Sequence, residues 1–173
     1  MAYIEAEKEQ NMARYNRIFA ALDGANTQEA VVRRAFSIAH DNNAEVLFGH
    51  VIDSVPYEAN GIDFASLTQD GKERIEEAMK PYFDRATNDE CIPKFTLEVR
   101  AGRVTETLIE GLIDPYNPDL IICGVRGLSN IKYAFVGSVS THLIRSVNCD
   151  VLVIRPETLE EHPQDGGPNA PWN

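Results

Sequence analysis

The chain has 173 residues, 43% of them hydrophobic and 25% charged, which suits one globular domain with a buried core. Its net charge of −11 argues against nucleic acid and anionic membrane surfaces as partners, because their phosphate groups would be repelled. No apolar run approaches the roughly 18 residues of a membrane span, and the acidic N-terminus does not resemble a signal peptide. We therefore expect a cytoplasmic protein that binds neither nucleic acid nor membrane.

The two ends of the chain differ from its middle in composition. Residues 1–16 are polar, and residues 157–173 combine acidic residues with glycine and proline. We expect one domain over residues 17–156, flanked by these two tails. The three cysteines, Cys91, Cys123 and Cys149, have an odd count and no CxxC spacing, which favours reduced structural thiols.

The predicted domain begins with a strand and a helix. The run RIFAAL, residues 17–22, predicts a short strand that ends before Asp23. Asn26, with Glu29 three residues later, is typical of a helix start. Apolar residues then recur at helical spacing over residues 31–39, which predicts an amphipathic helix ending near the sequence DNN.

The middle of the chain continues the alternation of strand and helix. Residues 45–52 form an apolar run that predicts a strand buried on both faces. Residues 53–67 carry turn residues without a period and predict a loop, and an apolar stripe from Ile75 to Ala86 predicts a helix that Pro81 kinks or ends. The alternating run KFTLEVR, residues 94–100, indicates a half-covered edge strand.

The last third completes the pattern. A helix over residues 103–114 should be stopped by Pro115 and Pro118. The runs DLIIC and DVLVIR predict two buried strands on either side of the helix SVSTHLIRS. Alternating strands and helices at this spacing favour an open, doubly wound α/β fold, with a parallel sheet and helices on both faces. Ligands of such sheets bind beyond the carboxyl ends of the strands, here at Asp23, at residues 50–53 and after Cys123.

A loop with three glycines follows the strand DLIIC. Gly124 and Gly127 are three residues apart, and Gly137 comes after a spacer of nine residues, at the start of the last helix. Glycine permits positive φ and lets the backbone approach a ligand closely. A helix N-terminus offers backbone N–H groups and the positive end of a dipole, so this arrangement predicts a phosphate site.

Polar side chains reinforce that prediction. Ser138 and Ser140 lie in the first turn of the helix, and Arg126 and Lys132 add positive charge between the glycines. The spacing matches neither GxxxxGK[ST] nor GxGxxG, which argues against a GTPase or a dehydrogenase. The alternative is that the glycines only form a turn and a helix cap.

No catalytic or metal-binding constellation is visible in the sequence. The chain lacks a GxSxG elbow, an HExxH helix and carboxylates that the sequence pairs. His40 and His142 have no Cys or His partner at metal spacing, and His50 lies in an apolar run that indicates a buried, hydrogen-bonded side chain. We expect no catalytic residues and no metal held by protein side chains.

The glycine loop, written G-x2-G-x9-G-S, resembles the motif of the ATP-binding branch of the universal stress protein family. The stretches RIFAALDG, GHVID and CDVLVIRP are similar to that family's first, second and final strands. The resemblance covers residues 17–156. It implies a Rossmann-like fold of five parallel strands in the order 3-2-1-4-5, and a homodimer formed through the last strand, Val151 to Ile154.

The resemblance also implies a site for ATP or another adenine nucleotide, with Mg²⁺ bound through the phosphates. Asp23 would contact the adenosine moiety, and the backbone at Val51 the adenine ring. The residues expected to bind nucleotide are Ala21, Leu22, Asp23, Val51, Cys123, Gly124, Arg126, Gly127, Lys132, Gly137, Ser138, Val139 and Ser140.

Three functions remain open at this point. The first is an ATP-binding regulatory dimer that reports nucleotide status to a downstream protein in the stress response. The second is a slow Mg²⁺-dependent ATPase or phosphotransferase, which would use the same loop with Arg126 and Lys132. The third is a nucleotide-free scaffold dimer, against which the intact glycine motif speaks. An efficient ATPase needs a positioned water and charges for the transition state, and no residue is clearly assigned to these tasks.

Overall fold

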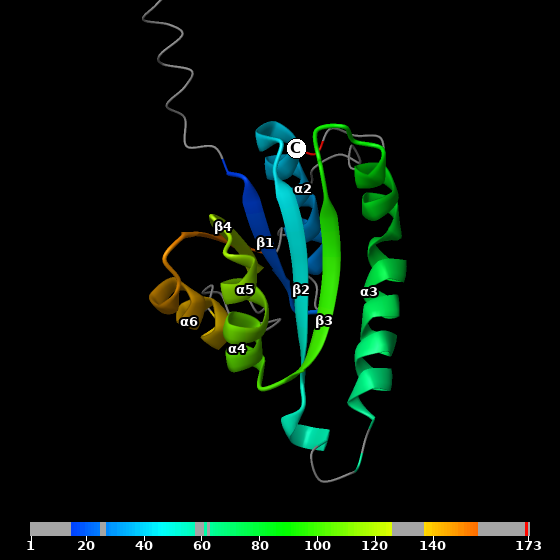
Figure 1. Ribbon diagram of the computed structural model, residues 1–173, viewed down its shortest axis with the longest axis vertical. Helices are drawn as coiled ribbons and strands as arrows, with labels where there is room; N and C mark the ends of the chain where they lie inside the picture. Colours follow the sequence, from blue (N-terminus) through cyan, green and yellow to red (C-terminus); the bar gives the residue numbers. More distant parts are fainter. Residues whose placement is uncertain are drawn as a thin grey trace, which may run out of the picture.

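The computed structural model describes residues 15–24, 27–57, 61, 63–125, 137–155 and 172. Within these residues the chain forms a five-stranded, all-parallel sheet in the order β3-β2-β1-β4-β5, with helices on both faces (Figure 1). The strands are β1 (Arg17–Leu22), β2 (Glu45–Asp53), β3 (Phe95–Gly102), β4 (Leu120–Gly124) and β5 (Asp150–Ile154). The predicted doubly wound fold is confirmed, together with its strand order.

The helical segments lie between these strands. They are α2 (Gln28–Asn42), the 3-10 turn η1 (Val55–Tyr57), α3 (Phe64–Thr87), α4 (Val104–Glu106), the π-helix η2 (Thr107–Ile113), α5 (Asp114–Tyr116) and α6 (Ser138–Ser146). Within the described ranges, no helix combines the length and the apolar character that crossing a bilayer requires.

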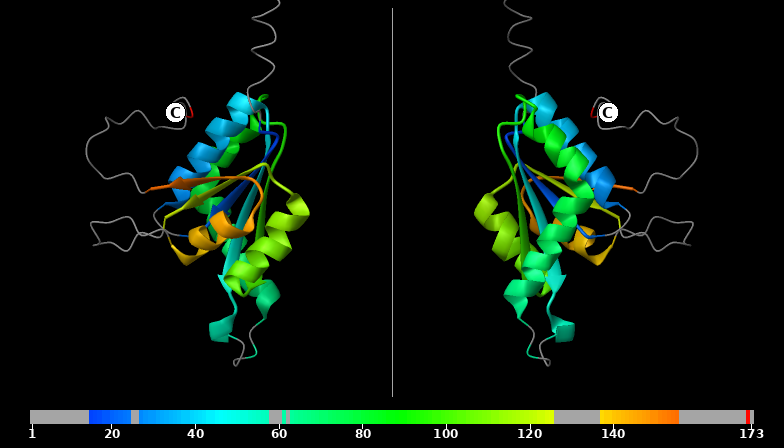
Figure 2. Two further views of the ribbon diagram at one scale, coloured as in Figure 1. Left: turned by 90° about the vertical axis from the view of Figure 1, so that its left-hand side faces the viewer. Right: turned by 90° about the vertical axis from the view of Figure 1, so that its right-hand side faces the viewer.

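The central strand β1 separates two cores. Because side chains alternate along a strand, Ile18 and Ala20 face one side of the sheet and Phe19 faces the other. Helices α2 and α3 cover the first side, while α4, η2, α5 and α6 cover the second (Figure 2). Both faces of β1 are therefore buried.

An aromatic cluster forms the centre of the first core. The ring of Phe36, on α2, is fully buried, and four aromatic rings lie with their centroids 5.0 to 6.0 Å from it: Phe48, Phe83, Phe95 and Trp172. Trp172 belongs to the C-terminal segment, and the guanidinium of Arg85 lies 3.8 Å from the centre of its ring. This residue of the predicted tail therefore contacts the folded domain.

One helix boundary differs from the prediction made on residues 53–86. Helix α3 begins at Phe64, inside the predicted loop, because the side chain of Asp63 accepts a hydrogen bond of 2.9 Å from the backbone N–H of Ala65 and caps the helix. Of the two effects predicted for Pro81, a kink or an end of the helix, the end is excluded, because the helix continues through this residue. Pro81 and Glu77, whose carbonyl loses its N–H partner, are both exposed, so water can satisfy that carbonyl.

The next helix passes Pro115 and ends directly before Pro118, the second of the two prolines predicted to stop it, so it extends two residues further than predicted. Helical backbone extends from Val104 to Tyr116 through the π-helical turn η2. It ends at Asn117, whose left-handed conformation (φ 51°) allows its N–H to donate to the carbonyl of Ile113 at 2.8 Å.

The prediction is correct for one edge strand of the sheet and wrong for the other. Strand β3 is an edge strand with alternating exposure, as predicted. Strand β5 is predicted to be buried, but it forms the other edge, and residues 151–154 are only half-buried. In the part of the chain that the structure describes, β5 pairs with β4 along one side only.

Candidate functional site

A cavity of about 330 Å³ lies at the carboxyl ends of β1, β2 and β4, next to the start of α6. This volume is within the range of small-molecule sites. The predicted site residues that line it are Ala21, Leu22, Asp23, Val51, Cys123, Gly124, Gly137, Ser138, Val139 and Ser140. The other three, Arg126, Gly127 and Lys132, lie outside the described residues.

The topology of the sheet explains why these segments meet. Strand β1 pairs with β2 on one side and with β4 on the other, so the chain's strand order reverses between β1 and β4. The carboxyl ends diverge at such a reversal and leave a crevice. Ala21 is in register with Cys123 on one neighbour and with Gly49 on the other, which brings residues about 100 positions apart to one edge.

The start of α6 forms one wall of this cavity. Gly137 precedes the helix in an extended conformation, with φ −61° and ψ 163°, and its carbonyl accepts the first helical hydrogen bond, 2.9 Å from the N–H of Thr141. The N–H groups of Ser138, Val139 and Ser140 therefore have no acceptor within the helix. These groups and the helix dipole make this wall suitable for an anion.

The hydroxyl of Ser140 has a structural role in the described site. It is buried, donates to the carbonyl of Gly124 at 3.2 Å and accepts from the thiol of Cys123 at 3.6 Å. These contacts attach α6 to β4. Ser140 therefore offers its backbone N–H, and not its hydroxyl, to the cavity.

The Cys123 thiol is a structural group, as the sequence suggested. Burial raises its pKa, the hydrogen bond to Ser140 partly offsets this, and the nearby carboxylate of Asp23 raises the pKa further. The thiol thus stays protonated at neutral pH and is a poor nucleophile. Asp23 itself accepts a hydrogen bond of 3.4 Å from the hydroxyl of Thr27.

Gly124 differs from the prediction in its physical role. Its φ is not positive; among the described glycines only Gly24 and Gly61 have that conformation. Glycine is needed at position 124 because a Cβ there would lie 2.3 Å from Oγ1 of Thr27 and 2.8 Å from its Cβ. The residue allows the start of α2 to approach β4 closely.

Replacing Gly124 by alanine should therefore lower the free energy of unfolding by about 1–3 kcal/mol, the usual range for overpacking. Urea denaturation followed by circular dichroism measures the change. Gly111→Ala is the matched control, because a Cβ at Gly111 would meet no atom closer than 3.5 Å. Equal stability of Gly124→Ala and the wild type would contradict this explanation.

Three polar residues of the cavity were absent from the predicted site. His50 and Asp53 come from β2 and Arg74 comes from α3. His50 is hydrogen-bonded, as expected, with its Nδ1 2.8 Å from the carbonyl of Leu22, but it lines the cavity instead of being buried in the core. The carboxyl end of β2 is one of the predicted ligand positions, whereas no local signal distinguishes Arg74 from other exposed helical arginines.

Comparison with known proteins identifies the family. The sequence profile described as "Universal stress protein family" matches residues 14–155. A universal stress protein of Staphylococcus aureus strain USA300 is 33% identical over 148 residues, which are 86% of this chain and 89% of the relative.

Solved structures of low sequence identity share the fold. UspA from Lactobacillus plantarum superimposes with a TM-score of 0.68 at 24% identity, covering 83% of this chain and all of the other. A universal stress protein in complex with cAMP superimposes with a TM-score of 0.58, also at 24% identity, covering 83% of this chain and 99% of the other. The family profile, the relative and the fold agree on the same family. The chain belongs to the universal stress protein family.

Proposed function

We propose that the protein is an adenine-nucleotide-binding regulator of the stress response, with ATP as its ligand, which acts in the cytoplasm as a homodimer. The observation that carries this proposal is the cavity at the reversal of strand order, since it joins an apolar hollow to the N-terminus of α6. A nucleotide has the same two parts, a flat apolar base and a polyanionic phosphate chain.

The apolar part of the cavity suits the adenine ring. Val51, Val104 and Leu108 contribute aliphatic side chains from β2, α4 and η2. Asp23 and His50 lie at the same opening and can hydrogen-bond the ribose hydroxyls or the edge of the base. A carboxylate would repel phosphates, which supports placing Asp23 at the nucleoside end.

The helix start suits the phosphates. The N–H groups of residues 138–140 can donate to phosphate oxygens, and the guanidinium of Arg74 adds positive charge to the cavity wall. Gly127, Arg126 and Lys132 would contribute from the loop of the glycine motif, with Mg²⁺ bound through the phosphates. The solved universal stress protein in complex with cAMP supports an adenine nucleotide as the ligand class.

The edge strand β5 supports a homodimer. Residues 151–154 are half-buried in the single chain, and the strand has an open edge in the described part of the molecule. Pairing with the same strand of a second copy would satisfy its backbone groups. Light scattering across the micromolar range should give the mass of a dimer; a monomer throughout would contradict this part of the proposal.

Isothermal titration of the purified full-length chain with ATP, ADP, AMP and cAMP tests nucleotide binding. We expect one site per chain, and a rise in melting temperature with ATP. The double variant Gly127→Val, Gly137→Val should abolish both signals, whereas Gly111→Ala, outside the cavity, should retain them. Unchanged ATP affinity in the double variant would contradict the site. Release of inorganic phosphate from ATP at a rate above background would favour the ATPase alternative.

A further inference from the structure

Three potential metal ligands meet at the end of the sheet opposite the cavity. His40 lies in the last turn of α2, and Asp89 and Cys91 lie in the turn between α3 and β3. One nitrogen of the imidazole, one carboxylate oxygen and the thiol sulfur all lie within 4.8 Å of one another. His40 and Asp89 are 49 positions apart in the sequence, so local spacing gives no sign of the cluster.

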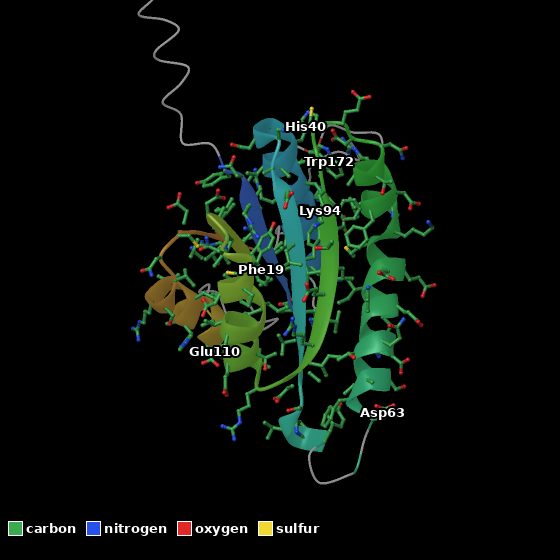
Figure 3. The ribbon with its side chains drawn as sticks, in the orientation of Figure 1. Phe19, His40, Asp63, Lys94, Glu110 and Trp172 are labelled. Atoms are coloured by element: carbon green, nitrogen blue, oxygen red, sulfur yellow. The ribbon has the colours of Figure 1, made fainter. Side chains whose placement is uncertain are left out.

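The carboxylate at the centre of the cluster is held in place from three sides. Its Oδ2 accepts a hydrogen bond of 2.9 Å from the indole N–H of Trp172, and its Oδ1 accepts one of 3.0 Å from the backbone N–H of Cys91. Nδ1 of His40 lies 2.8 Å from Oδ2. Figure 3 shows His40 and Trp172 next to each other at this end of the molecule. Outer contacts of this kind orient metal-binding carboxylates in proteins.

The charge of the cluster and its surroundings favours a cation. The described residues that line the surrounding hollow include three further acidic side chains, Glu77, Asp84 and Glu90, against two cationic ones, Lys80 and Arg85.

We propose that His40, Asp89 and Cys91 form a zinc-binding site. A thiolate, an imidazole and a carboxylate together suit a borderline divalent ion, and they argue against Mg²⁺ and Ca²⁺, which prefer oxygen ligands alone. On a tetrahedral ion with bonds of about 2.0 Å to nitrogen and oxygen and about 2.3 Å to sulfur, the ligand atoms are roughly 3.3 to 3.6 Å apart. The exposed side chain of Cys91 can rotate to reach this spacing.

Binding requires two changes of protonation. The thiol of Cys91 loses its proton to solvent. Nδ1 of His40, which donates to Asp89 without the metal, also gives up its proton, and the ring keeps a proton on Nε2 so that Nδ1 can ligate the ion. Oδ2 of Asp89 has a second lone pair for the metal beside the one that accepts from Trp172. The fourth position is left to water. Such an ion would join α2 to the turn before β3.

Zinc titration of the untagged, full-length, metal-free chain tests the site, in a buffer with a phosphine reductant. We expect one ion per chain with a dissociation constant in the micromolar range or below. Cys91→Ser and His40→Gln should each weaken binding at least tenfold. Cys149→Ser and His142→Gln, which change the same residue types elsewhere, should leave binding unchanged.

Cobalt provides a second measurement that is specific for the thiolate. Co²⁺ added to the wild type should give a sulfur-to-cobalt charge-transfer absorption, and Cys91→Ser should lack it while its far-ultraviolet circular dichroism is unchanged. Because Cys91 is exposed, this variant tests the ligand without disturbing the core. Equal zinc affinity in Cys91→Ser and the wild type, or no zinc uptake by the wild type, would overturn the proposal.

Discussion

Replacing Ser138 by glutamate is expected to weaken ATP binding tenfold to a hundredfold without loss of stability. The new carboxylate would lie in the first turn of α6, where the proposed phosphates bind. At a distance of about 6 Å and an effective dielectric constant of roughly 20–40, the repulsion is about 1.4–2.8 kcal/mol per pair of unit charges. An acidic side chain at a helix N-terminus stabilises the helix by about 0.3–1 kcal/mol, so affinity and stability should change in opposite directions.

Two controls make the test of Ser138→Glu specific. Ser138→Ala removes the hydroxyl without adding charge and should affect affinity much less. Ala65→Glu adds the same charge to the first turn of α3, outside the cavity, and should leave ATP affinity unchanged. Isothermal titration and thermal denaturation give the two quantities, and wild-type affinity in Ser138→Glu would show that the phosphates do not bind at α6.

Replacing Phe36 by alanine should cause the largest loss of stability, about 3–5 kcal/mol, because its ring is fully buried and the truncation leaves a cavity in the core. The edge-on contacts with Phe48 and Phe95 would be lost together with the buried area. Trp172, the one tryptophan of the chain, packs on Phe36 with ring centroids 5.0 Å apart. Its fluorescence emission should therefore shift to longer wavelength in the variant.

Urea denaturation gives the free energy of unfolding of Phe36→Ala, and fluorescence spectra of the native state report on Trp172. Phe64→Ala is the matched control, because Phe64 is 36% exposed at the start of α3 and should change stability by less than about 1 kcal/mol. If Phe36→Ala lost no more stability than this control, the aromatic cluster would not be the centre of the core.

The order of the strands and helices could be predicted because each element leaves a local pattern. Apolar runs of five to eight residues predicted the strands, and helical spacing predicted the helices between them. The positions of boundaries were less certain, because they depend on single groups. The cap at Asp63 lengthened α3, and solvent around Pro81 allowed the helix to continue.

The candidate site was predictable in part because the strands that end at it are predictable from local sequence patterns. The carboxyl ends of parallel strands must meet at one edge of the sheet, so the strand pattern alone is enough to place Asp23, Val51 and Gly124 together. Arg74 reaches this edge from α3, and the position of a helix over a sheet depends on packing between segments far apart in the chain. The local sequence around Arg74 therefore does not predict that this side chain lies at the cavity.

The sequence by itself determined the alternation of elements, the parallel sheet and the glycine motif at the start of α6, because each of these depends on residues close together along the chain. Only the tertiary structure showed that Gly124 makes room for Thr27, that the Ser140 hydroxyl attaches α6 to β4, and that His40 approaches Asp89. Each of these facts is a contact between side chains or backbone groups of different elements. Such contacts follow from how the helices pack on the sheet, and the periodicity of a single segment does not contain that information.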